Sequence, residues 1–246
     1  MPEIRFSGKT DTGIRRLENE DVFVVFPELN LCALADGMGG AAAGELASGM
    51  FAEAVVETFS KARQRSERES MELVEQTYRV ANERIVDHTR ENPGHQGMGC
   101  TAELLAFFDQ GYVLGHVGDS RTYLFRDGQL KRLTNDHSVV QLQIDQGLIT
   151  PEGARTHPLR NVILRAVGTN EVLAVDLIRG RVLSGDLFLL CSDGLTDMVE
   201  DKVLHEVLAG DLRLPQKADK LVELANSAGG HDNVTVVLGE VVATQS

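Results

Sequence analysis

The sequence predicts an α+β domain in which two antiparallel β-sheets pack face to face with helices outside, a four-layer α-β-β-α sandwich. Short strand-like runs are joined by turns rather than by crossover helices, and two amphipathic helical segments follow one another directly in the sequence. A chain of 246 residues is long enough to bury a large core. We therefore expect a single domain over residues 1–246.

Strands are expected where short runs are rich in β-branched, aromatic and other apolar residues and are bounded by turn residues. The pair Asp127-Gly128 favours a tight hairpin, and the loop within residues 107–113 is similar. Connections this short indicate antiparallel pairing. The predicted strands are residues 22–26, 31–35, 101–108, 112–117, 121–125, 187–192 and 234–242.

Apolar residues at helical spacing predict two long helices, at residues 44–59 and 71–91. The polar, charge-rich stretch 61–70 is expected to join them. Two further helices fit residues 136–146 and 214–228.

Composition argues against several classes of protein. Acidic residues outnumber basic residues 37 to 24, and a formal net charge of −13 argues against binding nucleic acid or an anionic membrane. The sequence has no apolar run long enough to span a bilayer and begins without the features of a signal peptide, so the cytoplasm is the expected compartment. Cys32, Cys100 and Cys191 are far apart in apolar or glycine-rich contexts and are expected to be buried thiols.

Four aspartates, Asp36, Asp119, Asp193 and Asp232, occur at the ends of predicted strands, three of them beside glycine. A single Asp-Gly pair usually marks a turn. Four such acids can converge at one edge of a layered structure, where carboxylates must be protonated, separated or bound to cations. Because cysteine and histidine patterns are lacking, the oxygen ligands favour magnesium or manganese.

A second group of charged residues precedes the first predicted strand, in the stretch IRRLENEDVF. An arginine beside an acidic metal site can bind a phosphate with the two arms of its guanidinium group. Arg16 is a candidate, but Arg15 is equally basic, and spacing does not choose between them. A salt bridge between Arg16 and Glu18 or Glu20 at the surface is the simpler alternative.

Six motifs along the chain, between Gly13 and Val237, together resemble one known family. The chain resembles the metal-dependent protein phosphatases, the type-2C serine/threonine phosphatases, and in length it is similar to the bacterial single-domain members that reverse the work of eukaryotic-like Ser/Thr kinases. Six motifs in the same order are far more specific than one Asp-Gly pair. The motifs are RRLENED, ADGMGG, MGCTA, HVGDSR, LCSDGL and GGHDNVTVV.

The resemblance implies a centre with two core metal ions. Asp36 would bridge both ions, and the backbone carbonyl of Gly37 would bind one of them. Asp193 and Asp232 would complete the shell of the second ion.

Further roles follow from the same resemblance. Glu20 would contact the water shell of the first ion, with Asp21 as a supporting acid. Arg16, rather than Arg15, matches the phosphate-binding arginine of the family. Asp119, with Asp193, would hold a possible third metal ion.

The resemblance therefore implies a Mg²⁺- or Mn²⁺-dependent protein phosphatase that hydrolyses phosphoserine and phosphothreonine. A hydroxide shared by two close cations has a lowered pKa and can attack phosphorus directly, without a phosphoenzyme. The expected partners are phosphorylated proteins and a cognate Ser/Thr kinase, with the protein acting as a monomer. The insertion at residues 138–165, broken by glycines and prolines, resembles a mobile flap beside the cleft that governs substrate choice.

The chain departs from the family pattern at two positions. Ala41 stands where many bacterial members have histidine, and Met38 stands where eukaryotic members often have it. His231 is then a candidate proton donor to the leaving oxygen, with a metal-bound water as the other option and a plain turn histidine as the simpler reading. These departures support an alternative function, a catalytically weak regulator that binds phosphoproteins, while a phosphatase of small metabolites is a third possibility.

Smaller features carry structural expectations. His116 is expected to be a hydrogen-bonded strand residue in the core. Cys100 and Glu103 are expected to be details of packing or of a sheet edge. Asn233 either orients the neighbouring metal ligand or caps a turn.

Overall fold

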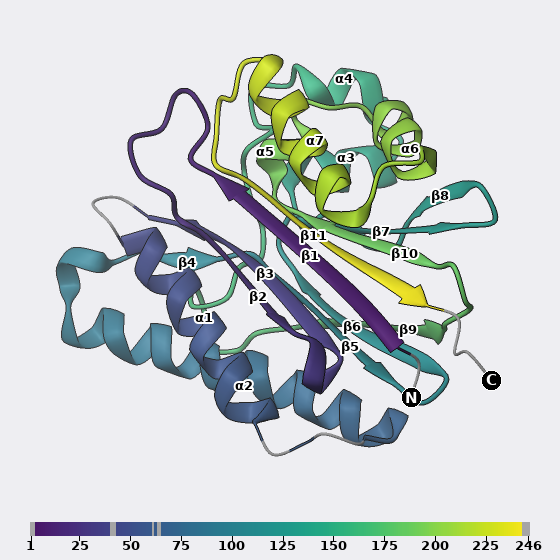
Figure 1. Ribbon diagram of the computed structural model, residues 1–246. Coiled ribbons are helices and arrows are strands. Elements are labelled where there is room, and N and C mark those ends of the chain that lie inside the picture. The colour runs from purple at the N-terminus through teal and green to yellow at the C-terminus, as the bar shows by residue number, and fades with distance from the viewer. Residues whose placement is uncertain (1–2, 40–42, 61, 63–64, 243–246) are drawn as a thin grey trace.

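Two antiparallel sheets form the centre of the protein. The computed structural model describes residues 3–39, 43–60, 62 and 65–242. Figure 1 shows strands running diagonally between two groups of helices. One sheet has the order β1-β11-β10-β7-β8 and the other β2-β3-β5-β6-β9, with β4 added to β3, and every pairing is antiparallel.

The first sheet consists of β1 (Glu3–Asp11), β7 (Arg121–Arg126), β8 (Gln129–Arg132), β10 (Leu187–Cys191) and β11 (Val234–Val242). The second consists of β2 (Asp21–Phe26), β3 (Leu31–Met38), β4 (Gly99–Cys100), β5 (Ala102–Phe108), β6 (Gly111–Val117) and β9 (Asp176–Arg181). The inner faces of the two sheets pack through apolar side chains such as Leu34, Leu105 and Phe188.

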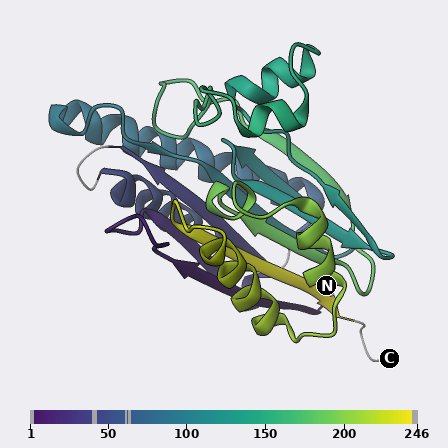
Figure 2. The same cartoon turned by 90° about the horizontal axis from the view of Figure 1, so that it is seen from above.

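Helices cover both outer faces, as Figures 1 and 2 show. The outer face of the β2–β9 sheet packs against α1 (Ala43–Phe59) and α2 (Glu67–Glu91). The outer face of the other sheet packs against α5 (Asp193–Thr196), α6 (Asp201–Ala209) and α7 (Leu214–Ser227). The predicted four-layer α-β-β-α sandwich is therefore confirmed.

The remaining helices lie in connections. Two short 3₁₀ turns, η1 (Pro27–Leu29) and η2 (Pro93–His95), begin with proline. The helices α3 (Val139–Asp145) and α4 (Pro151–Arg155) lie in what we call the α3–α4 segment, residues 138–165. Figure 2 shows these two teal helices projecting from the layered body.

Local sequence explains most of the predicted elements. The β7–β8 hairpin turns at Asp127 and Gly128, whose φ angles of 50° and 71° suit the predicted tight turn. The helix predicted from residue 71 begins earlier, at Glu67, because Ser66 and Glu69 form a capping box. The helix predicted from residue 136 begins only at Val139, with Ser138 as its N-cap.

Several elements were not predicted. The strands β1 and β9 and the helices α4, α5 and α6 carry weaker local patterns. The strand predicted to end at residue 35 continues to Met38, because Gly37 and Met38 pair with the two-residue strand β4. All of the three cysteines are buried and free, as expected. In the described part of the chain, no helix is long and apolar enough to cross a membrane.

A histidine and a carboxyl group are fully buried side by side on neighbouring strands of the second sheet. His116 on β6 faces Glu103 on β5 through Nδ1, and its Nε2 lies 3.0 Å from the carbonyl oxygen of Asn135. Thr122 donates a hydrogen bond of 2.5 Å to the other oxygen of Glu103. Burial lowers the pKa of His116, but Glu103, the carbonyl of Asn135 and the charge of Asp136 together offset this, so that the pKa is raised. His116 is the hydrogen-bonded core residue that was expected, whereas Glu103 is not at an edge, because β5 lies between β3 and β6.

Replacing Glu103 by alanine is expected to lower the free energy of unfolding by about 3–5 kcal/mol, because His116 and Thr122 would remain buried without their shared partner. Urea unfolding measures the change. Glu75→Ala, at an exposed site on α2, is the matched control and should change stability by less than about 0.5 kcal/mol. Equal midpoints for the two variants would contradict the prediction.

Candidate active site

Strand ends from both sheets bring acidic residues into one cleft of about 450 Å³. Asp36 lies near the end of β3, Asp119 lies between β6 and β7, Asp193 begins α5 directly after β10, and Asp232 precedes β11. The convergence expected of these four aspartates is therefore observed. The cleft is also lined by Arg16, Glu20, Gly37, Met38, Gly39, Thr101, Asn161, Val162 and Ile163.

Asp21 lies behind this cleft rather than in its lining. It is directly opposite Asp36 in the β2–β3 pairing and is 5% exposed. Ser192 donates a hydrogen bond of 2.8 Å to Oδ2 of Asp21, whereas Oδ1 is buried without a hydrogen-bond partner. Asp21 is thus placed to support the neighbouring acids.

Burial and mutual repulsion raise the pKa values of these acids. Burial, then the charges of other carboxylates, raises the pKa of Asp36 and of Asp193 well above the ordinary range. Burial is also the main reason that the pKa of Asp21 rises to about 6 and that of Asp119 to about 7. The site therefore disfavours ionised carboxylates unless positive charge is supplied.

The donor groups present fit divalent cations. Among the described residues, Asp36, Asp119 and Asp193 form no ion pair with a basic side chain, and Oδ1 of Asp21 is an orphaned acceptor. Oxygen atoms of this kind are the preferred ligands of Mg²⁺ and Mn²⁺. As the described side chains stand, no three or more acidic, histidine or cysteine groups are arranged to hold an ion alone. Backbone carbonyls and water would therefore have to complete a coordination shell.

The turn after Asp36 is packed too tightly for any residue but glycine. The amide of Gly37 donates to the carbonyl of Glu20 at 3.1 Å. A Cβ atom at Gly37 would lie 2.2 Å from the carbonyl oxygen of Gly44, and one at Gly44 would lie 2.6 Å from Cδ of Glu20. The start of α1 thus packs directly against the metal-site candidates Gly37 and Glu20.

Arg16, and not Arg15, lines the cleft. Its Nη2 donates to Oδ2 of Asp232 at 2.7 Å, and its side chain is 49% exposed. Of the two arginines that spacing left open, the one that the family resemblance implied is therefore the one at the cleft. The alternative salt bridge to Glu18 or Glu20 is not formed, since the carboxylate it pairs with belongs to Asp232.

Asn233 holds the loop that carries Arg16. Its side-chain amide donates to the carbonyl oxygens of Thr12 and Glu18, both at 2.9 Å, and its Oδ1 accepts from the amide of Glu20 at 2.8 Å. Its own amide donates to Oδ1 of Asp232 at 2.8 Å. Asn233 therefore connects the loop to the neighbouring acid, which is more than capping a turn.

Three contributors were not predicted. Thr101 accepts a hydrogen bond from the amide of Asp36 at 3.2 Å and lies 2.7 Å from the hydroxyl oxygen of Ser120, so it connects Asp36 to the turn that carries Asp119. Asp197 adds negative charge beside Asp119 and Asp193, raising the pKa of both. Thr101 and Ser120 lie within the motifs MGCTA and HVGDSR, but only their tertiary contacts show that they support Asp36 and the turn of Asp119.

The structure places two of the three positions considered for a proton donor. The third, Ala41, lies outside the described residues. Met38 lines the cleft, and no histidine belongs to the described lining of that cleft. His231 is exposed and lines a neighbouring side pocket together with Arg16 and Asp232.

The α3–α4 segment is fastened at its base beside Asp119. The amide of His137 donates to the carbonyl of Gly118 at 2.7 Å, and the amide of Gly118 donates to Nδ1 of His137 at 3.0 Å. Burial lowers the pKa of His137 to about 4, which suits this acceptor role. At the other end, the amide of Leu164 donates to the carbonyl of His137 at 2.7 Å.

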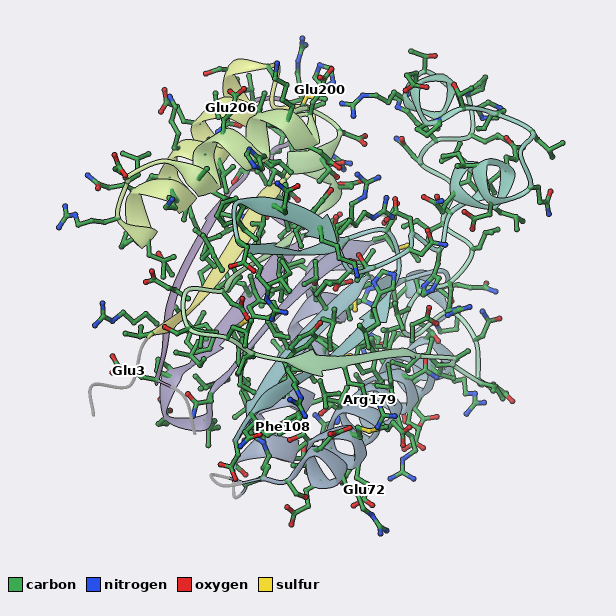
Figure 3. All side chains as sticks on the ribbon, turned by 90° about the vertical axis from the view of Figure 1, so that its right-hand side faces the viewer. Glu3, Glu72, Phe108, Arg179, Glu200 and Glu206 are labelled. Carbon is green, nitrogen blue, oxygen red and sulfur yellow. The ribbon has the colours of Figure 1, made fainter. Side chains whose placement is uncertain are left out.

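The segment also reaches across the cleft. Arg155 on α4 donates to the carbonyl oxygen of Asp197 at 3.1 Å, and Asn161, Val162 and Ile163 line the cleft itself. Figure 3 shows α3 and α4 at the upper right, apart from the helix near which Glu200 and Glu206 are labelled.

Comparison with known proteins identifies the family. The sequence model described as Protein phosphatase 2C matches residues 15–227. The chain is 39% identical over 242 residues to the serine/threonine protein phosphatase PstP of Mycobacterium tuberculosis, covering 97% of this chain and 45% of that protein. It is 36% identical over 241 residues to the serine/threonine phosphatase stp of Listeria monocytogenes, covering 96% of each. The chain belongs to the protein phosphatase 2C family.

A solved structure supports the same assignment. The catalytic domain of a serine/threonine protein phosphatase PstP, in complex with two manganese ions, superposes with a TM-score of 0.89 at 38% identity, covering 98% of this chain and 99% of that one. The present chain spans less than half the length of the mycobacterial relative.

Replacing Asn233 by alanine removes three hydrogen bonds around a buried amide. We expect the free energy of unfolding to fall by about 1–3 kcal/mol. We also expect KM for p-nitrophenyl phosphate to rise more than kcat falls, because the loosened loop carries Arg16. Urea unfolding and steady-state kinetics measure these effects, with the exposed Asn170→Ala as control. An unchanged KM would show that the loop keeps its position without Asn233.

Divalent cations are expected to stabilise the protein more at about pH 7.5 than at about pH 5. Aspartates whose folded pKa is raised, such as Asp21 to about 6 and Asp119 to about 7, destabilise the metal-free fold as pH rises through these values. Bound Mn²⁺ removes this penalty and adds its own binding free energy. Thermal unfolding with Mn²⁺ and with EDTA measures the difference at each pH. The Asp36→Asn variant should lose most of the stabilisation by Mn²⁺. An equal rise in unfolding temperature with Mn²⁺ at both pH values would contradict the prediction.

Proposed function

We propose that this protein is a Mg²⁺- or Mn²⁺-dependent phosphatase that hydrolyses phosphoserine and phosphothreonine in proteins. The observation that carries the proposal is the cleft in which Asp36, Asp193 and Asp232 meet Arg16. Family membership and the manganese complex of a relative support the same chemistry.

The residues that would hold the ions are those named by the motifs. Asp36, the carbonyl of Gly37, Asp193 and Asp232 would bind two core ions, and Glu20 would contact the water shell with Asp21 behind it. Asp119 and Asp193 would hold a third ion. Bound there, divalent cations lower the pKa of water and offset the charge of a phosphate.

Arg16 would orient the phosphate. Among the described residues, the Arg16 side chain donates one hydrogen bond, from Nη2 to Asp232, so its other N–H groups can bind phosphate oxygens with the planar geometry of the guanidinium group. Because Arg16 and Asp232 are paired, the phosphate would be held directly beside a metal ligand.

A cysteine nucleophile is disfavoured by the environment of all three thiols. Cys32, Cys100 and Cys191 are fully buried, and burial raises the pKa of each thiol. A buried neutral thiol is a poor nucleophile. Direct attack by water on phosphorus is therefore the better account.

The surroundings of the cleft favour protein substrates. Leu17, next in sequence to Arg16, is 99% exposed, and the cleft-lining Val162 is exposed together with Leu159 and Leu164 of the same α3–α4 segment. Exposed apolar side chains near a polar cleft are typical of a surface that receives another polypeptide. A small phosphorylated metabolite would not contact these apolar side chains.

We further propose that the α3–α4 segment acts as a flap that governs substrate choice, and that the enzyme opposes a Ser/Thr kinase in the cytoplasm as a monomer. The alternative, a catalytically weak regulator, rests on Met38 in the cleft in place of a proton donor. His231, in the adjoining pocket with Arg16, is our candidate for protonating the leaving oxygen.

Hydrolysis of p-nitrophenyl phosphate and of a phosphothreonine peptide, each with Mn²⁺, Mg²⁺ or EDTA, tests the proposal. We expect turnover that needs the metal and that falls by about 100-fold or more in Asp193→Asn, since a metal contributes several kcal/mol to the transition state. Asp211→Asn, at an exposed position, is the control for removal of one carboxylate. Folded protein without turnover in any divalent ion would favour the regulator, and a strong preference for small phosphate esters would favour the metabolite phosphatase.

A further inference from the structure

A side pocket of about 340 Å³ opens beside the candidate metal cleft. The two cavities share Arg16, Asn161, Asp193 and Asp232 in their linings. A group bound in the side pocket would therefore lie next to a phosphate held by Arg16. The side pocket is completed by Arg155, Arg160, Gly194, Asp197, Met198 and His231.

Arg155 is oriented by the protein but has unused donors. Its Nη2 lies 3.1 Å from the carbonyl oxygen of Asp197 and 3.5 Å from that of Thr196. Nε and Nη1 of Arg155 form no hydrogen bond to any described residue. One arm of the guanidinium group thus fixes the side chain, which leaves the rest available to a ligand in the pocket.

Arg160 is less constrained. It is exposed, and its side chain forms neither a hydrogen bond nor an ion pair within the described part of the chain. Its charge nevertheless acts on the pocket, because Arg160 and Arg155 both lower the pKa of Asp197 against the larger, opposite effect of burial. Neither arginine forms an ion pair with Asp197 or with any other carboxylate of the described residues.

The balance of charge in the pocket depends on the metal centre. Once Asp193 and Asp232 are neutralised by cations, the remaining charges are those of Arg16, Arg155 and Arg160 against that of Asp197. This local excess of positive charge occurs in a protein whose formal net charge is −13. An acidic protein repels acidic substrates in general, so a positive pocket at this point would select where an anion binds.

We propose that Arg155 and Arg160 form a subsite for a second anionic group of the substrate, a phosphate or carboxylate close in sequence to the phosphoserine or phosphothreonine that is hydrolysed. Guanidinium groups bind both kinds of anion through paired hydrogen bonds. The inference rests on the proposed phosphatase function and names a class of substrate for it, acidic or multiply phosphorylated segments.

Three phosphothreonine peptides of equal length test the subsite. One has alanine at the positions flanking the phosphothreonine, one has glutamate there, and one has phosphoserine at a flanking position, with the products resolved by mass spectrometry. With Mn²⁺, we expect kcat/KM to be about fivefold to tenfold higher for an anionic peptide than for the alanine peptide. The glutamate and phosphoserine arms distinguish the two sources of negative charge.

Arg160→Gln should reduce that preference by about fivefold, and Arg160→Lys should reduce it less, because lysine keeps the charge but not the planar fork. The preference of the wild type should also shrink in about 0.5 M NaCl, since the site is exposed. Arg79→Gln, which removes one positive charge from the exposed face of α2, is the matched control and should leave the preference intact.

The outcomes separate this inference from the function on which it rests. Metal-dependent hydrolysis of the alanine peptide without any preference for the anionic peptides would overturn the subsite alone. A preference that is equally strong in Arg160→Gln, in Arg155→Gln and in the double variant would overturn it as well. Absence of hydrolysis of all peptides and of p-nitrophenyl phosphate would overturn both proposals.

Discussion

Repulsion among carboxyl groups gathered at one end of the sandwich is the constraint on which the rest of the site depends. Asp36, Asp119 and Asp193 are drawn together from separate strand ends, and burial with mutual repulsion raises the pKa of each. Such a group opposes folding unless it is protonated or bound to cations. Its retention in a well-packed fold is best explained by a function that uses metal ions.

The surrounding structure holds Asp36 and Asp21 in place through neutral polar contacts, whereas Asp232 is also paired with Arg16. Thr101 binds the backbone of Asp36 on both sides, by its hydroxyl and by its amide. Ser192 donates to Asp21, and Asn233 connects the loop of Arg16 to Asp232. Neutral partners of this kind fix geometry without neutralising the carboxylates, which leaves their charge available to cations.

A second network connects the core to the α3–α4 segment. The buried pair of Glu103 and His116 reaches the carbonyl of Asn135, and the ring of His116 packs 4.5 Å from that of His137, which fastens both ends of the segment. The turn that carries Asp119 and the base of the α3–α4 segment are therefore both held by His116 and His137. The α3–α4 segment in turn carries Arg155 and Arg160, which we assign to substrate binding.

The sequence by itself determined the two antiparallel sheets, the long helices and the motifs of the acidic site. These depend on local patterns: strands with short turns, apolar spacing in the helices, and aspartates at strand ends. It did not reveal β1 or β9, because their local patterns are weak and their strand structure depends on pairing with neighbouring strands, as for Glu3 with Val242.

Only the tertiary structure placed Arg16 in the cleft beside Asp232, showed that Glu103 is buried against His116 in the interior of a sheet, and assigned Asn233 and Thr101 their contacts. It also brought Arg155 and Arg160 beside the acids. Each of these outcomes joins segments that are distant in the chain, and such contacts arise from packing of whole layers rather than from the properties of any short stretch.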